Sequence, residues 1–248
     1  MEFIKSVSNS RIKAVCALKL GENRRETNTF FAEGLRVVLD APVNPIEVYV
    51  TENHEDVGRK FEKVCPVYVV SREAYEKISD TKSPQGVLAV FKKPDVSVKL
   101  PESDRAIVLD GVADPGNVGT IIRTAGAVGF RDVYLINCAD CFSPKVVRSS
   151  MGGVFRTRIN IGDHESVFRA LREKNYTVYS LDMGGESVFE KEIKKPCALV
   201  VGSEARGVSS YVREHADGVL CLPMVDDTES LNAGVSASTA MYVINFGK

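Results

Sequence analysis

Hydrophobic residues in the C-terminal part of the chain form short unbroken runs separated by stretches with helical periodicity. We expect the runs to be strands covered on both faces, because they lack the alternation of half-exposed strands. They lie at 105–110, 132–136, 158–161, 177–182, 197–202 and 218–223. Helices are expected at 117–129, 165–174, 205–215 and about 230–245. Strands that alternate with helices predict an α/β domain with a mainly parallel sheet.

The first part of the chain has a less regular α and β pattern. Its expected helices are 8–20, capped by Ser8 or Asn9, and 73–79; its expected strands are 46–50, 67–70 and 86–93. Residues 91–103 are polar and include two prolines, which favours a connection between domains. We therefore divide the chain into a small α/β domain at 1–97, a linker at 98–103 and a second domain at 104–248.

The segment LDGVADPGNVGTIIRTAG, residues 109–126, joins the first strand of the second domain to a helix. An apolar stripe runs along this helix and contains Val118, Ile121, Ile122, Ala125 and Val128. At about 100° per residue, Arg123 points away from the stripe. Taken alone, the pattern allows Arg123 to be a solvated surface residue and Asn117 to be a helix cap. It equally allows both side chains to serve a site.

Two later segments also leave predicted strands through glycine or proline and carry polar side chains. They are VVGSEARGVS, residues 200–209, and LPMVDDTESLNAGVSAST, residues 222–239. Ligands of open α/β sheets bind outside the carboxyl ends of the strands. Each segment could be only a tight turn, but three of them at carboxyl ends favour one shared binding site.

In this order, the three segments resemble the sequence motifs of the SpoU (TrmH-like) RNA ribose 2′-O-methyltransferases. Residues 143–155, SPKVVRSSMGGVF, are similar to a further segment of that family. The opening residues resemble the small RNA-binding domain that precedes many such catalytic domains. The resemblance therefore covers nearly the whole chain, and it is much more specific for the family than for the RNA that is modified.

The resemblance implies a SPOUT-type α/β catalytic domain with a deep trefoil knot near its C-terminus, and a homodimer with the site near the subunit interface. S-adenosylmethionine would lie in a bend of the knotted loops, lined by Gly202, Leu222 and Leu231. The sequence contains neither G-x-G-x-x-G after a strand nor G-x-x-x-x-G-K-[ST], which agrees with such a pocket.

The resemblance also assigns roles to polar residues of the three motifs. Arg123 matches the arginine proposed to deprotonate the ribose hydroxyl. Because a guanidinium stays protonated at neutral pH, it is a weak base, and we expect Arg123 both to bind the phosphate–ribose unit and to assist deprotonation, with the balance between the two roles left open. Asn117 would hold the loop and Arg123 in place. Glu204, Ser230 and Asn232 match positions that organise the cofactor site; the alternative for Glu204 is a structural pairing with an arginine. The chain departs from many relatives at Ala233-Gly234, where they have Val-Ser.

The formal net charge of −1 provides no global attraction for nucleic acid, so RNA must be held by local basic patches. Two stretches are locally basic, 11–25 and 142–161. They could grip RNA phosphates, or they could be ordinary solvated surfaces. The residues that we name as candidate RNA ligands are Arg11, Arg24, Arg25, Lys145 and Arg148.

No apolar run is long enough for a bilayer, and the N-terminus lacks the apolar core of a secretory signal, so we expect a cytoplasmic protein without membrane contact. Cys138 and Cys141 have C-x-x-C spacing but no second pair or nearby histidine, and we expect no metal site.

We therefore expect an enzyme that methylates a ribose 2′-hydroxyl of RNA, most readily ribosomal (23S) RNA. The alternatives are a transfer-RNA substrate, a non-catalytic RNA-binding or ribosome-assembly factor, and a nucleotide-dependent oxidoreductase. The missing phosphate fingerprint argues against the oxidoreductase.

Overall fold

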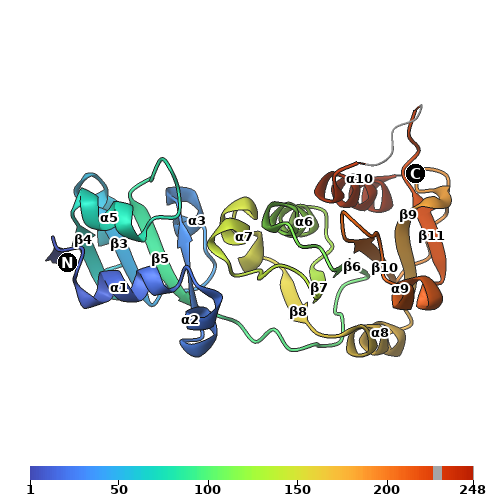
Figure 1. Ribbon diagram of the computed structural model, residues 1–248, viewed down its shortest axis with the longest axis horizontal. Coiled ribbons are helices and arrows are strands. Elements are labelled where there is room, and N and C mark those ends of the chain that lie inside the picture. Colours follow the sequence, from blue (N-terminus) through green and yellow to red (C-terminus); the bar gives the residue numbers. More distant parts are fainter. Residues whose placement is uncertain (226–230, 248) are drawn as a thin grey trace. The chain divides into compact units, whose positions relative to one another are not determined.

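A computed structural model of the chain describes residues 1–225 and 231–247, which fold as two compact units (Figure 1). Unit 1 contains Met1–Pro94 and Phe142–Phe155, and unit 2 contains Asp95–Cys141 and Arg156–Lys248. Residues 98–103, which were expected to be a linker, lie in unit 2. There the Lys99 amide donates to Asn160 Oδ1 at 3.0 Å, and the Tyr134 hydroxyl donates to the Lys99 carbonyl at 2.9 Å.

Unit 2 is built on a six-stranded sheet in which every neighbouring pair is parallel, so the predicted parallel sheet is confirmed. The strand order is β11-β9-β10-β6-β7-β8. The strands are β6 (Arg105–Asp110), β7 (Asp132–Ile136), β8 (Arg158–Ile161), β9 (Thr177–Ser187), β10 (Cys197–Gly202) and β11 (Gly218–Cys221). The central strands β6, β7 and β10 are buried along almost their whole length, as their unbroken apolar runs predicted.

Helices cover both faces of this sheet (Figure 1). They are α6 (Pro115–Ala127), α8 (His164–Glu173), α9 (Ser210–His215) and α10 (Ala233–Phe246). Apolar residues of α8 and α9 form one core cluster with alternate residues of β6, β7, β9 and β10. On the other face α6 packs along α10, and all five residues of its predicted stripe are buried. Among the described residues no helix has the length and apolar character that a bilayer crossing requires.

Unit 1 contains a five-stranded mixed sheet of order β1-β4-β3-β5-β2. Its strands are β1 (Glu2–Ile4), β2 (Thr29–Glu33), β3 (Glu47–Thr51), β4 (Val67–Val70) and β5 (Val87–Lys92). β5 pairs antiparallel with both β3 and β2, whereas β1, β4 and β3 are parallel. The helices are α1 (Ser10–Ala17), α2 (Gly21–Glu26), α3 (Leu35–Leu39), α4 (Glu55–Arg59) and α5 (Arg72–Ile78), with the 3-10 turn η1 (Glu52–His54).

The segment Phe142–Phe155 leaves unit 2 in sequence but packs in unit 1. It contains α7 (Pro144–Ser149) and the 3-10 turn η2 (Gly153–Phe155), and α7 packs on β2. Phe142 and Phe155 lie with their ring centroids 4.8 and 5.6 Å from that of Phe30, and Phe155 lies 4.8 Å from Phe91. These aromatic contacts, far apart in sequence, attach the excursion to the edge of the sheet.

Several element boundaries differ from the predicted ones. The predicted helix 205–215 begins only at Ser210, because Ser203 and Gly207 pair as a β-bridge and close a turn first. Strand β9 runs to Ser187, since its end pairs with β11. Strands β1 and β2 and helices α2, α3, α4 and α7 were not predicted. The trefoil knot stays a prediction.

Asp132, at the start of β7, is a buried acidic side chain with 1% exposure. Burial alone raises its pKa, but hydrogen bonds from Arg158 and Ser103 outweigh burial and hold the pKa below its ordinary 3.8. The Arg158 guanidinium donates to both carboxylate oxygens, at 2.7 and 2.8 Å. The amide of Glu102 donates at 3.1 Å. Asp132 therefore ties the chain entering the sheet to β7 and β8.

We expect Asp132→Ala to lower the free energy of unfolding by about 3 kcal/mol at neutral pH, because it strands the Arg158 charge and several donors. The stabilisation is present above the ordinary carboxyl pKa and is lost as pH falls through the lower folded value. Urea unfolding followed by circular dichroism, at neutral pH and stepwise below about pH 4, measures both effects.

The matched control is Asp104→Ala, which removes an exposed carboxylate paired with Arg105 and should cost less than about 1 kcal/mol. Equal losses for the two variants, or a loss at Asp132 that does not shrink in acid, would contradict this account.

Candidate functional site

A cavity of about 420 Å³ opens at the carboxyl ends of β10 and β11, beside the middle of β9 and the start of α10. The middle of β9 contributes Leu181, Asp182 and Met183, and the β10 end contributes Val201 to Glu204 with Gly207. Leu222 and Met224 follow β11, and Leu231, Asn232, Ala233 and Ser236 come from the start of α10. Two of the three segments singled out in the sequence thus line one cavity, whereas the strand-end argument predicted that all three would share a site.

Gly202 ends β10 at a point where a side chain cannot fit. A Cβ atom there would overlap the backbone of Gly207 and Val208. The chain turns back on Gly202 because the Ser203 and Gly207 backbones exchange hydrogen bonds, each at 2.9 Å. This close return of the backbone forms the floor of the cavity and presents Ser203 and Glu204 beside it.

Asn117 connects the remaining segment to the same loop. Its amide nitrogen donates to Glu204 Oε1 at 2.6 Å, and the residue is 8% exposed. The helix cap is Asp114, whose Oδ1 accepts from the Asn117 backbone amide at 2.9 Å, so Asn117 is not the N-cap. The structure therefore gives the Asn117 side chain a long-range contact, to a residue 87 positions away.

Gly234 explains the departure at Ala233-Gly234 from the motif of many relatives. A Cβ at Gly234 would lie 3.1 Å from Asn117 Oδ1 and 3.2 Å from Asn232 Oδ1. The glycine thus lets α10 approach the Asn117 amide closely. Asn232 caps α10, accepting from the Val235 amide at 3.2 Å, while it lines the cavity.

Asp110 anchors the other end of the Gly202 loop, and sequence reasoning missed this role. Its Oδ2 accepts from the Ser209 amide at 2.7 Å, and its Oδ1 lies 2.8 Å from His164 Nε2. The Ser209 hydroxyl lies 3.0 Å from the same ring nitrogen. In a nucleophilic triad the histidine contacts the acid through one ring nitrogen and the nucleophile through the other. Here the single nitrogen Nε2 of His164 contacts both Asp110 and Ser209, so this cluster is not such a triad. The available signal was a buried acid at the carboxyl end of β6.

Arg123 is exposed on α6 and does not line the cavity. The structure thus brings together Gly202, Glu204, Leu222, Leu231 and Asn232, connects Asn117 through Glu204, and leaves Arg123 outside the cavity wall. Ser230 lies outside the described residues.

The candidate RNA ligands of unit 1 have different surroundings. Arg24 is 4% exposed and donates to the Leu18 and Lys19 carbonyls, so its guanidinium serves the fold. Arg11 pairs with Glu47 at 2.9 Å and lies over the Tyr68 ring. Arg148 pairs with Asp80 at 3.0 Å. Arg25 is exposed at the end of α2, and Lys145 lies at the start of α7.

The two cysteines of the C-x-x-C spacing are built into the interior. Burial raises the pKa of the Cys138 thiol to about 11, and the thiol donates to the Leu109 and Ile136 carbonyls. Cys141 is fully buried. Within residues 1–225 and 231–247 no group of three or more His, Cys, Asp or Glu side chains could hold a metal ion.

Comparison with known protein families decides what kind of protein carries this cavity. Residues 104–242 match the SpoU rRNA Methylase family. The chain belongs to this family. Residues 9–89 match the MRM3-like substrate binding domain, which lies within unit 1.

Two relatives with similar sequences match most of the chain or nearly all of it. The 23S rRNA (guanosine(2553)-2′-O)-methyltransferase RlmP of Bacillus subtilis is 31% identical over 246 residues, 98% of each chain. The 23S rRNA (guanosine-2′-O-)-methyltransferase RlmB of Haemophilus influenzae is 26% identical over 230 residues, 84% of this chain and 92% of its own.

Among solved structures, the AdoMet-bound rRNA methyltransferase from Sinorhizobium meliloti superimposes with a TM-score of 0.88 and 28% identity. The superposition covers 97% of this chain and 96% of that one. The similarity to this methyltransferase thus extends over nearly the whole chain.

Proposed function

We propose that the chain transfers a methyl group from S-adenosylmethionine to a ribose 2′-hydroxyl of 23S ribosomal RNA. The observation that carries the proposal is the cavity at Gly202, which lies within the region that matches the SpoU family. Relatives similar along the whole chain carry names of 23S rRNA 2′-O-methyltransferases, which favours ribosomal over transfer RNA. Such a substrate implies a cytoplasmic location.

The cavity residues fit S-adenosylmethionine in size and charge. Its volume of 420 Å³ is in the range of sites for ligands of this size, about 300–1,000 Å³. Leu181, Leu222 and Leu231 provide apolar wall for a purine ring. Asp182 and Glu204 supply carboxylates, and no Lys or Arg is among the described lining residues, so the cavity favours a cation such as a sulfonium.

When bound, S-adenosylmethionine supplies an electrophilic methyl group. The chain's own task is to hold the ribose hydroxyl in line with it, since orientation is a large source of rate enhancement. The Asn117 amide holds Glu204 against the cavity, and Asp110 holds Ser209 at the far end of the same loop. Arg123 is exposed and lies outside the cavity lining. Its position therefore favours contact with the RNA over contact with the cofactor. Its permanently charged fork binds the phosphate beside the reacting ribose.

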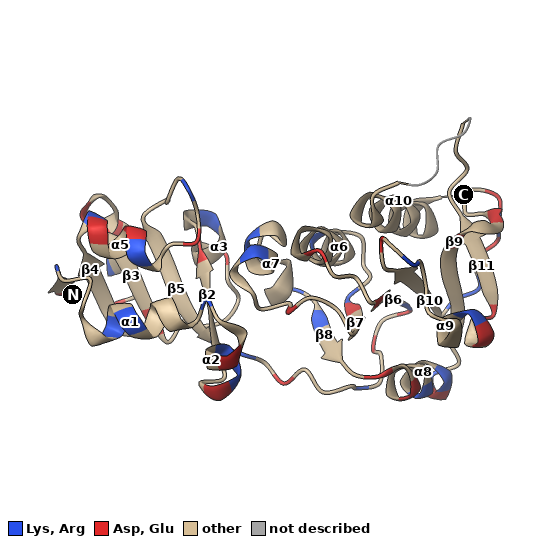
Figure 2. Cartoon of the chain, in the orientation of Figure 1, with Lys and Arg blue, Asp and Glu red and all other residues tan. Residues whose placement is uncertain are grey.

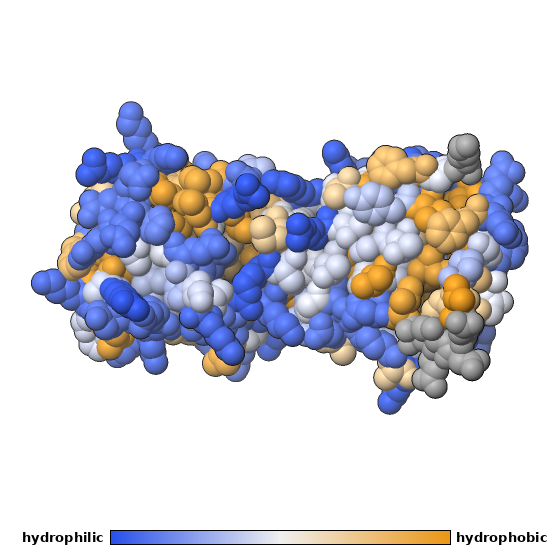
Figure 3. Space-filling view, turned by 90° about the horizontal axis from the view of Figure 1, so that it is seen from above, coloured by the Kyte–Doolittle hydropathy of each residue, from blue (hydrophilic) through white to orange (hydrophobic). Residues whose placement is uncertain are grey.

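The functional protein is a homodimer that uses the outer face of α10. Val235, Tyr242 and Phe246 recur on this face with exposures of 50, 52 and 67%. The helix carries no charged residue, as Figure 2 shows. Figure 3, which looks onto this side of the chain, shows hydrophobic side chains at the surface around α10. An exposed apolar helix face without charges favours a protein partner, and a second copy is always available.

We expect Arg123→Ala to reduce transfer of labelled methyl groups to ribosomal RNA by about 100-fold in kcat, because the reacting unit loses its charged anchor. Equilibrium binding of S-adenosylmethionine, measured by calorimetry, should be unchanged. The RNA used is ribosomal RNA from cells that lack the gene.

The matched control is Arg131→Ala, which removes another exposed arginine of unit 2 and should keep full activity. If Arg123→Ala were as active as this control, the role given to Arg123 would be wrong. If the wild type transferred no methyl group to any cellular RNA, a non-catalytic RNA-binding or assembly factor would be the better account.

We expect Phe246→Asp to convert the dimer into a monomer, since burying an unpaired carboxylate in an apolar interface is costly. Light scattering after size-exclusion chromatography gives the mass. Val64→Asp, at an exposed apolar residue of unit 1, should leave the mass unchanged. A wild type that is monomeric at micromolar concentration would refute the α10 dimer.

A further inference from the structure

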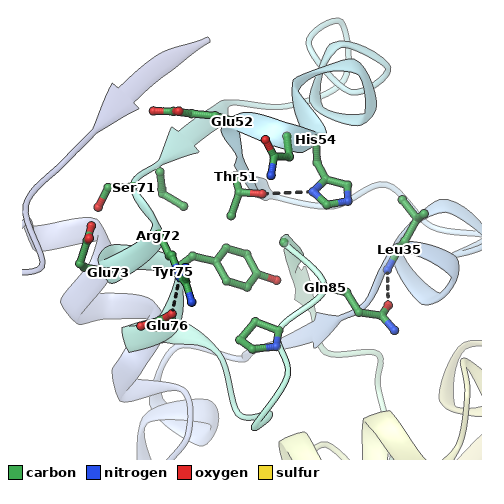
Figure 4. Close-up of a pocket in the computed structure, with 14 residues that line it drawn as sticks. Leu35, Thr51, Glu52, His54, Ser71, Arg72, Glu73, Tyr75, Glu76 and Gln85 are labelled. Atoms are coloured by element: carbon green, nitrogen blue, oxygen red, sulfur yellow. Dashed lines mark hydrogen bonds and ion pairs between the residues drawn. The ribbon is translucent and has the colours of Figure 1, made fainter.

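Unit 1 contains a second and larger cavity, of about 950 Å³, that the methyl-transfer chemistry does not use. It lies at the carboxyl ends of β3 and β4, between α5 and the 84–86 segment that precedes β5 (Figure 4). All its lining residues fall within unit 1 and within the segment that matches the substrate binding domain.

The Tyr75 side chain is buried in the wall of this cavity and carries a hydroxyl without a well-aligned partner in the described part of the chain. The residue is 1% exposed, and its hydroxyl makes no well-aligned hydrogen bond among the described residues, although Glu33 and the Val87 backbone lie near it. Figure 4 shows its ring pointing from α5 toward the side of the cavity where His54 and Gln85 lie. Burying a hydroxyl without a partner costs free energy, so such a group in a cavity points to a ligand that supplies the missing bond.

The opposite wall is held rigidly. The Thr51 hydroxyl lies 3.1 Å from His54 Nδ1, and the Thr51 amide donates to the Gly86 carbonyl at 3.0 Å. A Cβ at Gly86 would lie 2.5 Å from Thr51 Oγ1 and 2.6 Å from His54 Nδ1. Only glycine therefore allows the 84–86 segment to pass this close. Gln85 is fixed in turn, because its Oε1 accepts from the Leu35 amide at 3.2 Å.

The charges at the cavity exclude a phosphate. Three carboxylates line it, those of Glu52, Glu73 and Glu76, against one guanidinium, Arg72. Arg72 is paired with Glu76 at 2.9 Å, which leaves a net negative wall. The lining of the cavity therefore suits a flat, neutral ligand that carries hydrogen-bond donors. The His54 ring and the Arg72 guanidinium are planar surfaces for stacking, and carboxylates accept from ring and exocyclic N–H groups.

We propose that this cavity takes up an unstacked nucleobase of the RNA substrate, stacked beside His54 and hydrogen-bonded to the Tyr75 hydroxyl and a wall carboxylate. The proposal rests on the proposed function in one respect, that the substrate is RNA. RNA is read mainly at unpaired bases that are splayed out of the helix. The cavity thus recognises a base, while phosphates bind elsewhere on the chain.

The test blocks the cavity with Asn53→Trp, at an exposed lining residue, and compares it with Asn44→Trp, at an exposed asparagine outside the cavity. Binding to ribosomal RNA from cells that lack the gene should weaken by about 10-fold for Asn53→Trp only, as expected for one lost stacked base. The KM for RNA should rise with little change in kcat, and the affinity for S-adenosylmethionine should not change.

Tyr75→Phe provides a second variant, which removes a hydroxyl that makes no well-aligned hydrogen bond with the described residues of the free protein and keeps the ring. It should weaken RNA binding by about 5-fold without lowering the urea midpoint. Ultraviolet cross-linking of the wild type to the same RNA should leave nucleotide adducts on peptides that contain His54 or Tyr75.

RNA binding by Asn53→Trp and Tyr75→Phe equal to that of Asn44→Trp, with adducts only elsewhere, would overturn the proposal. These readouts need no methyl transfer, so the two proposals fail separately. If the wild type methylates RNA but its RNA binding does not depend on the cavity residues, only the proposed nucleobase site is refuted. A wild type without methyl transfer, whose RNA binding nonetheless depends on Asn53 and Tyr75, supports the base site and refutes the enzyme.

Discussion

The contact on which the candidate active site depends is the return of the chain onto Gly202. A strand of buried apolar residues ends there, and the next six residues fold back so tightly that no Cβ can be tolerated. The return directs Ser203 and Glu204 into the cavity instead of into a helix. Without it the cavity would lose its floor, and the polar residues gathered around it would have no common ligand.

Polar contacts from distant parts of the chain hold this loop at both ends. Asn117 on α6 holds Glu204, and Asp110 at the end of β6 holds the amide of Ser209. Asn117 and Asp110 are buried, whereas Glu204 is exposed and Ser209 half-buried, so each contact ties a loop residue at the surface to a buried polar group that needs a partner. The close approach of α10 at Gly234 completes the arrangement. The site is thus preorganised by four elements, which suits a reaction that depends on orientation.

The strands and the cavity wall of unit 2 could be predicted because their signals are local. Unbroken apolar runs identify buried parallel strands, and strand-end glycines and polar residues mark a ligand site. The burial of Arg24 against backbone carbonyls could not be predicted. The sequence does not show whether a basic side chain will bind a phosphate or a carbonyl of its own chain. The packing of Phe142–Phe155 in unit 1 could not be predicted either. The aromatic rings of unit 1 that contact this segment lie more than 50 positions away in sequence. The anchoring role of Asp110 required the position of His164 and Ser209 in space.

Calorimetric titration of the wild type and of Gly202→Ala with S-adenosylmethionine tests the central claim most directly. The account predicts that the wild type binds S-adenosylmethionine and does not bind nicotinamide dinucleotides, and that Gly202→Ala remains folded yet loses at least about 100-fold in affinity, since the loop must leave its place. Equal affinity of the two proteins for S-adenosylmethionine, or binding of a nicotinamide dinucleotide in its place, would contradict it.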